Sequence, residues 1–449
     1  MRPSQRMFPP KRRKPHGALP FVAVPPRPMK RSWYRTLDVW PLLLWLLLSS
    51  VGLIAIYSTT HGPAAEYMAA SVQNNFYRQL TWMGICAVGI GIALTLPVRF
   101  YRNAAYPVYG LTVVLLIAAL IFGQEVNGAK SWLVLGPLRL QVSELAKVGT
   151  VLAVAQLLSE RRSQPSRNVR DALKAVALVL LPAILIILQN DMGTALVFFG
   201  LVPILLFWSG LPLHIILLMI SPAIAGYLSL VYMPAAIAFA VLFTAGVAWV
   251  TRNRVIGALA AVFTGGVSAV TSVAIGYVLQ PHQVARLMSF TNPEAEEFRQ
   301  GVGFHLVQSK AAIGSGGLWG KGFMDGTQTQ GAYVPEQSTD FIFSVIGEEF
   351  GFVGSLIVLA LFAAFLLRLV WLGAEVKHPF GSLVAAGAVG VYLIHVFVNI
   401  GMATGMLPVI GIPLPFLSYG GSAMLANTAM LAIVLAIHMR RDALSIYGY

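Results

Sequence analysis

The sequence predicts an all-α polytopic membrane protein with about 12 transmembrane helices and a large extracytoplasmic loop. Three observations carry this prediction. Of the 449 residues, 57% are hydrophobic and only 11% are charged, whereas a soluble domain carries roughly 25% charged residues. The mean hydropathy is +0.74. Apolar runs of about 18 residues or more recur along the chain, and each is long enough to cross the hydrocarbon core of a bilayer as a helix.

The apolar runs define the expected membrane segments. One of them contains the single cysteine, Cys86, so an intramolecular disulfide is excluded. The segments are expected near residues 39–58, 79–98, 104–123, 143–159, 172–189, 194–209, 213–232, 234–250, 255–279, 340–371, 382–405 and 420–439.

The placement of positive charge predicts the orientation. The net charge is +14, but the bases cluster beside apolar runs, so no nucleic-acid partner is expected. With the basic, Pro-rich tail 1–37 in the cytoplasm, alternate connections are cytoplasmic and hold most of the 31 Lys and Arg residues. The C-terminal tail 443–449 is then also cytoplasmic, and the loops 59–78, 124–142 and 280–339 lie outside.

Two outer connections differ from ordinary loops. Gln189-Asn-Asp-Met-Gly-Thr194 joins two apolar helices, and Asp191 there either caps the second helix or serves a substrate. The run Leu407–Ser422 contains three prolines and three glycines, which cannot continue a helix, yet it is strongly apolar. Irregular backbone at membrane depth is tolerated where it lines a protein-covered cavity. We expect this run to line a cavity on the outer face.

Ionisable side chains gather at the outer edge. Asp340 stands at the mouth of an apolar helix, where a carboxylate is costly and indicates function. Glu144 and Lys147 are spaced i,i+3 and form either a structural ion pair or part of a site. At least one of Glu348 and Glu349 should face the protein interior. Several bases around one or two carboxylates favour an outward site for an anionic ligand.

The motifs of these outer regions are specific, and they read Asn127-Gly-Ala-Lys-Ser-Trp132, Gly136-Pro-Leu-Arg139, Ser143-Glu-Leu-Ala-Lys147, Asn190-Asp-Met-Gly-Thr-Ala195, Pro335-Glu336 to Gly347-Glu-Glu349, and Ser418-Tyr-Gly-Gly-Ser422. In this order they resemble the SEDS family of bacterial cell-wall proteins (shape, elongation, division, sporulation). Gly326-Thr-Gln-Thr-Gln330 and Gly411-Ile-Pro-Leu-Pro-Phe-Leu-Ser-Tyr419 are more similar to the RodA branch than to the FtsW branch.

The resemblance implies a transmembrane domain over residues 38–442. It also implies a family core of ten helices, to which the region 213–279 adds a pair. Arg252 and Arg254 mark the inner turn of that added pair. One turn departs from the family pattern, because the usual Gln-Pro-Asp reads Gln-Asn-Asp here, which keeps the acid Asp191.

The resemblance further implies a peptidoglycan glycosyltransferase of the bacterial inner membrane. Such an enzyme polymerises lipid II into glycan strands for cell elongation and rod shape, with an extracytoplasmic active site. Asp340 matches the family's essential aspartate, the general base that takes the proton of the acceptor's GlcNAc 4-hydroxyl. Arg139, Glu144, Lys147 and Asp191 match further positions important in the family, and we expect them to bind substrate.

The leaving pyrophosphate needs cationic stabilisation or a divalent metal such as Mg²⁺ or Mn²⁺. Lys130, Lys310 and Lys321 are added to the site on charge and sidedness alone. The resemblance implies a class B penicillin-binding protein and the rod-complex proteins MreC and MreD as partners. Two alternatives are a lipid II flippase and a non-catalytic scaffold for a penicillin-binding protein. A flippase needs polar groups across the whole membrane, whereas here they gather at the outer side.

Overall fold

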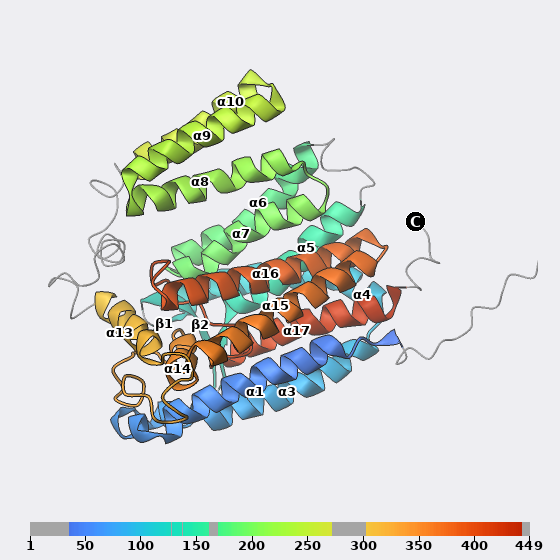
Figure 1. The fold of residues 1–449 in the computed structure, drawn as a ribbon. Helices are drawn as coiled ribbons and strands as arrows, with labels where there is room; N and C mark the ends of the chain where they lie inside the picture. The colour runs from blue at the N-terminus through green and yellow to red at the C-terminus, as the bar shows by residue number, and fades with distance from the viewer. Residues whose placement is uncertain (1–35, 127, 137, 161–168, 272–301, 442–449) are drawn as a thin grey trace, which may run out of the picture.

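The computed structural model describes residues 36–126, 128–136, 138–160, 169–271 and 302–441. Nearly all of the predicted tail 1–37, the tail 443–449 and the part 280–301 of the large loop lie outside the described residues. Within these ranges the protein is a bundle of long helices (Figure 1). The long helices are α1 (Trp40–His61), α3 (Asn75–Thr95), α4 (Val98–Phe122), α5 (Val142–Glu160), α6 (Val169–Leu188), α7 (Met192–Trp208), α8 (Leu213–Val231), α9 (Met233–Thr251), α10 (Arg254–Ala261) with its continuation Val262–Gly266, α15 (Gly351–Glu375), α16 (Pro379–Ala403) and α17 (Gly421–Met439).

The predicted multi-pass membrane fold is confirmed. Among the described residues, 11 helices are long and apolar enough to cross a membrane, and Met192–Trp208 is a shorter apolar helix. The smaller elements are η2 (Pro63–Tyr67), α2 (Ala70–Gln73), α13 (Val302–Ser315) and α14 (Ile342–Glu349).

The two ends of the bundle carry different parts of the chain. At one end the chain's first and last described residues meet, because Thr36 Oγ1 donates to the Met439 carbonyl at 2.8 Å. Arg440 donates to the Leu94 carbonyl at 2.7 Å at the same end. The sheet, α13 and α14 lie at the opposite end (Figure 1). The connections predicted as inner and outer therefore segregate to opposite ends.

A small antiparallel sheet occupies the predicted loop 124–142. Its strands are β1 (Gln124–Val126), β2 (Ala129–Leu135) and β3 (Leu138–Gln141), in the order β1-β2-β3. The β2–β3 hairpin pairs Trp132 with Gln141, directly before α5 begins. Lys130 N donates to the Gln189 carbonyl at 2.9 Å, which ties the sheet to the α6–α7 turn. The sheet thus fixes the start of α5 beside Asp191.

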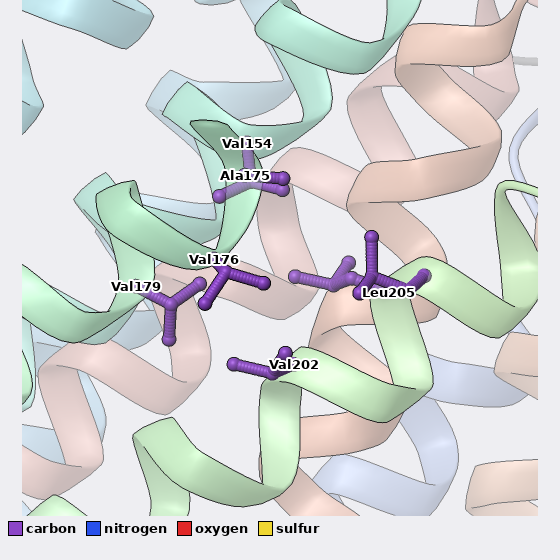
Figure 2. Close-up of a pocket in the computed structure, with 7 residues that line it drawn as sticks. Val154, Ala175, Val176, Val179, Val202 and Leu205 are labelled. Carbon is purple, nitrogen blue, oxygen red and sulfur yellow. The ribbon is translucent and has the colours of Figure 1, made fainter. Parts of the chain in front are cut away.

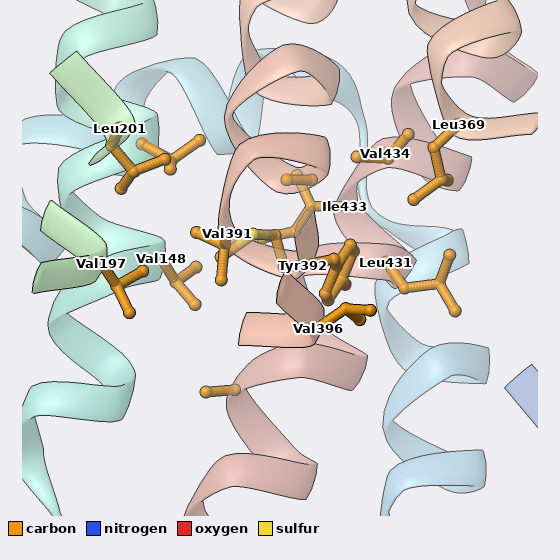
Figure 3. Packing of buried hydrophobic residues seen from close by; sticks show 14 of the residues in the cluster. Val148, Val197, Leu201, Leu369, Val391, Tyr392, Val396, Leu431, Ile433 and Val434 are labelled. Carbon is orange, nitrogen blue, oxygen red and sulfur yellow. The ribbon is translucent and has the colours of Figure 1, made fainter. Parts of the chain in front are cut away.

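The core lies where α5, α16 and α17 cross. These are the most buried membrane helices, whereas α3, α8 and α9 expose most of their surface. Val148, Leu201 and Val391 interdigitate there, beside Tyr392 and Leu431 (Figure 3). Since lipid tails are as apolar as these side chains, such tight packing is what holds the helices together.

A small pocket between α5, α6 and α7 is wholly apolar (Figure 2). It is lined by Val154, Ala175, Val176, Val179, Val202, Leu205 and Leu206. No polar group reaches it, so it offers no chemistry.

The helices α9 and α10 lie at the edge of the bundle and pack mainly on α8 and on each other (Figure 1). Leu218, Val247 and Ala260 form their own buried cluster. This peripheral position favours the prediction that the region 213–279 adds a pair of helices to a ten-helix core. The addition itself stays a prediction.

The predicted segment 340–371 begins close to the observed helix start at Ile342, but it is not a single helix. The chain forms the short α14 and then α15, and Gly351 between them has φ +67°. A side chain at Gly351 would lie 2.8 Å from the Leu318 carbonyl oxygen, so this close backbone contact breaks the helix. Asp340 lies directly before α14, at the mouth of an apolar helix as predicted.

Candidate active site

The irregular run Leu407–Gly420 folds against the loop Tyr333–Asp340. Tyr419 N donates to the Ser338 carbonyl at 2.8 Å, and Ser418 Oγ donates to the Thr339 carbonyl at 2.5 Å. Ser418 Oγ also accepts from Leu414 N at 2.8 Å. The broken backbone predicted from the prolines and glycines is present, and several of its polar groups are bonded by this loop, by α16 and by Gln79 of α3.

Asp340 is half-buried beside this broken run. A side chain at Gly411, which has φ +76°, would lie 3.2 Å from Asp340 Oδ2. The backbone therefore passes directly over the carboxylate. Burial is the main cause that raises the pKa of Asp340 to about 7, and the charges of Glu336 and Asp191 contribute to the same rise. A pKa close to neutrality is the property that suits a carboxyl group to general acid–base chemistry.

Asp191 caps α7, which confirms the capping role, one of the two roles predicted for it. Its Oδ1 accepts from Thr194 N at 3.0 Å, and its Oδ2 accepts from Thr194 Oγ1 at 3.0 Å. Gln141 Nε2 at 3.3 Å and Ser143 Oγ at 3.4 Å also approach Oδ2. Burial raises the pKa of Asp191 despite these donors. Capping and a place in the site are therefore compatible.

The turn that carries Asp191 reaches the same broken run from the other side. A side chain at Gly193 would lie 2.8 Å from the Ile410 carbonyl oxygen. The short stretch Ile410–Ile412 thus separates the Asp191 turn from Asp340, and the two aspartates act on each other electrostatically.

Glu144 and Lys147 form the expected ion pair, with Lys147 Nζ 2.8 Å from Glu144 Oε1. Both side chains are buried, and Lys147 Nζ also lies 2.7 Å from His395 Nε2. This pair faces the bundle interior and reaches the site through His395. A direct substrate contact of either residue stays a prediction.

Lys321 pairs with Glu348 and keeps only part of its side chain exposed. Its Nζ lies 2.8 Å from Glu348 Oε1, and Glu348 is fully buried. Glu348 also accepts from Gln328 N at 2.9 Å and Thr329 N at 2.8 Å. These bonds fold the loop that precedes Asp340.

Glu349 is buried as well. It accepts from Ser58 Oγ of α1 and from Gln330 Nε2, the latter at 2.9 Å. The expectation that at least one of the two glutamates faces inward is confirmed for both. They brace the loop and α14.

Three predicted cations have exposed side chains at this end of the bundle: Lys130 in β2, Arg139 in β3 and Lys310 in α13. The aliphatic part of Lys310 packs on Gly405, at 2.9 Å from a side chain placed there. Nothing in the described structure brings these cations into contact with Asp340.

Sequence reasoning missed three polar residues next to the site. His305 stacks on Phe341 at 6.2 Å between ring centroids. His395 and Asn399 bond to the broken run from α16. Both lie in the apolar run 382–405, where a polar side chain is itself a functional signal. In the described part of the chain, no three His, Cys, Asp or Glu side chains are grouped to hold a metal ion.

Comparisons with known proteins agree with this arrangement. A profile of the cell cycle protein family FtsW/RodA/SpoVE matches residues 39–236 and 227–443. The chain is 34% identical to the peptidoglycan glycosyltransferase MrdB of Escherichia coli K12, over 93% of this chain and 98% of that protein. It is 33% identical to the peptidoglycan glycosyltransferase RodA of Treponema pallidum, over 90% and 98%.

Two solved structures share the fold. One comes from a peptidoglycan synthase complex that coordinates polymerization and crosslinking, with a TM-score of 0.67 at 28% identity, over 90% of this chain and 98% of that one. RodA of Thermus thermophilus matches with a TM-score of 0.59 at 27% identity, over 92% and 98%. With the profile spanning nearly the whole described bundle, the chain belongs to the FtsW/RodA/SpoVE family of membrane proteins.

Proposed function

We propose that this chain is a peptidoglycan glycosyltransferase that polymerises lipid II, with Asp340 as its general base. The observation that carries the proposal is the half-buried Asp340, whose pKa is raised to about 7 beside the broken run, in a family whose relatives bear that activity in their names.

The reaction needs a base and a stabilised leaving group. The acceptor's GlcNAc 4-hydroxyl attacks the donor's anomeric carbon, and Asp340 takes the hydroxyl proton. The bond from that carbon to the pyrophosphate oxygen breaks, and the lipid pyrophosphate leaves with the electron pair. A base with a pKa near the working pH is both ionised and strong enough for this proton transfer.

Cations assist the departure of the pyrophosphate. Lys130, Arg139 and Lys310 are exposed at the site's end of the bundle and suit contact with phosphate oxygens. A divalent cation such as Mg²⁺ or Mn²⁺ would be held by Asp340 or Asp191, which lie on opposite sides of Ile410–Ile412, because Mg²⁺ commonly binds one or two carboxylates plus substrate phosphates. When bound, it would neutralise the pyrophosphate. Chelation should then abolish polymerisation, and Mg²⁺ or Mn²⁺ should restore it.

The proposed location is the bacterial inner membrane, with both termini cytoplasmic and the site extracytoplasmic. It is supported by the bases Arg99, Arg102, Arg252, Arg254 and Arg368 near the helix ends opposite the site. A class B penicillin-binding protein is the proposed partner, in line with the synthase complex that shares the fold. MreC and MreD would complete a rod-forming assembly.

Asp340→Asn tests the proposal directly. The purified protein with its penicillin-binding partner should convert lipid II into glycan chains, and this variant should not. Asp325→Asn is the matched control, because it makes the same change at an exposed position of the preceding loop. Full activity of Asp340→Asn would show that Asp340 is not the general base. Normal growth of cells that carry only this variant would favour a non-catalytic scaffold for a penicillin-binding protein. Translocation of lipid II in vesicles without any polymerisation would favour a flippase.

A further inference from the structure

Helix α16 carries two polar side chains on one face, His395 and Asn399, four residues apart. They are 1% and 0% exposed. A buried polar side chain in an apolar helix costs free energy unless it is hydrogen-bonded. Their partners therefore indicate their purpose.

Asn399 joins the loop of Asp340 to the broken run. Its Nδ2 donates to the Ile412 carbonyl at 2.7 Å and to the Asp340 carbonyl at 2.8 Å. An amide nitrogen has two hydrogens, and both are used here. One side chain thus fixes the distance between the backbone of the candidate base and the segment that passes over it.

His395 fixes the next carbonyl of the same run. Its Nδ1 lies 3.0 Å from the Pro413 carbonyl oxygen, which can only accept, so Nδ1 carries the hydrogen. Its Nε2 then accepts from Lys147 Nζ at 2.7 Å, and Glu144 in turn holds Lys147 at 2.8 Å. A chain of polar contacts therefore runs from α5 through α16 to the broken run.

These bonds determine what surrounds the carboxylate. With the carbonyls of Ile412 and Pro413 held, Gly411 is kept against Asp340 Oδ2. Ile410, on the other side, is kept against the turn of Asp191. The relative placement of the two aspartates depends on the same segment.

We propose that Asn399 and His395 are positioning residues for glycosyl transfer, which hold Asp340 in its productive place through the carbonyls of residues 340, 412 and 413. They touch no reacting atom and act on the base through the backbone. The inference rests on the proposed function.

The test compares Asn399→Leu with Asn427→Leu in the full-length protein with its partner and lipid II. Asn427 is equally buried, in α17, and its side-chain amide has no hydrogen-bond partner among the described residues. The control thus removes a buried asparagine without removing any hydrogen bond of its side chain. We expect kcat of Asn399→Leu to fall about 100-fold with KM changed less than about twofold, since a displaced base impairs the chemical step rather than binding. The control should retain its kcat.

Two further readouts separate positioning from general stability. A carboxylate released toward water loses part of its raised pKa, so the acid limb of the kcat profile should move to lower pH in Asn399→Leu only. His395→Asn, which keeps a donor near the Nδ1 position, should retain more kcat than His395→Ala. Asn399→Ala lacks both donors and adds no charge, so it repeats the test if the leucine variant does not fold.

The outcomes are distinct. A folded Asn399 variant with wild-type kcat and an unmoved acid limb overturns this inference alone, as does an equal loss in Asn427→Leu. A wild-type protein that makes no glycan, or an Asp340→Asn variant with full activity, overturns the proposed function instead.

Discussion

Glu336→Gln should move the pH dependence of the reaction without removing any catalytic group. Glu336 is exposed in the loop before Asp340 and adopts φ +49°. Its charge is one of two that raise the pKa of Asp340 beyond the effect of burial. Removing this charge should lower that pKa and shift the acid limb of kcat to lower pH.

The magnitude follows from the environment of the two carboxylates. The pKa of Asp340 rises from 3.8 to about 7, which corresponds to about 4 kcal/mol, and burial is the largest cause. Glu336 is exposed, so water screens its interaction to about 1 kcal/mol or less. At 1.36 kcal/mol per pKa step, the acid limb should move down by about 0.7 pH or less. The kcat at its plateau should be unchanged.

The assay is lipid II polymerisation measured from about pH 5 to about pH 9, at low and at high salt. Glu125→Gln is the matched control, because Glu125 is an exposed glutamate of β1 and is not among the charges that shift Asp340. High salt should shrink the shift caused by Glu336→Gln. A wild-type acid limb near pH 4, or a limb that moves equally in both variants, would refute the assignment of Asp340 as the buried base.

Three further perturbations follow from the same geometry. Gly411→Ala should lower kcat strongly, because its side chain would crowd Asp340 Oδ2, while Gly210→Ala, with a positive φ of +97° and nothing within 4 Å, should cost about 1 kcal/mol of stability but little kcat. Lys147→Met should destabilise by about 3 to 5 kcal/mol by leaving Glu144 buried and unpaired, and the double variant with Glu144→Gln should recover most of that loss in thermal unfolding. Asp340→Asn should stabilise the protein at about pH 8 by up to about 4 kcal/mol. The folded carboxyl binds its proton more tightly than the unfolded one, so wild-type stability falls as pH rises from about 4 to about 7, and the advantage of the variant should vanish below that window.

The sequence predicted the membrane segments well because length and hydropathy alone determine whether a helix can span a bilayer. It also placed the breaks at Leu407–Ser422 and before α7, where proline, glycine and a capping aspartate act locally. The break at Gly351 was missed because it depends on a backbone contact with Leu318, which is distant in sequence from the start of the predicted helix.

Tertiary contacts also determine which of the predicted cations remain free to bind a substrate. Lys321 looked like a free cation, but it pairs with the buried Glu348. Asn399 and His395 were missed because their bonds to the site go to backbone carbonyls, which the sequence does not reveal. Their presence in an apolar run was the only signal.

The distribution of polar groups along the bundle bears on the choice between polymerase and flippase. The aspartates, the broken run and the exposed cations lie at the end where the sheet, α13 and α14 are found. The middle of the bundle is filled by side chains such as Val148, Leu201 and Val391 (Figure 3), all buried in tight contact. A sugar-peptide headgroup carried across would have to separate these tightly packed apolar side chains. Chemistry at one membrane face needs no such opening, so the packing favours glycosyl transfer at that face over transport through the bundle.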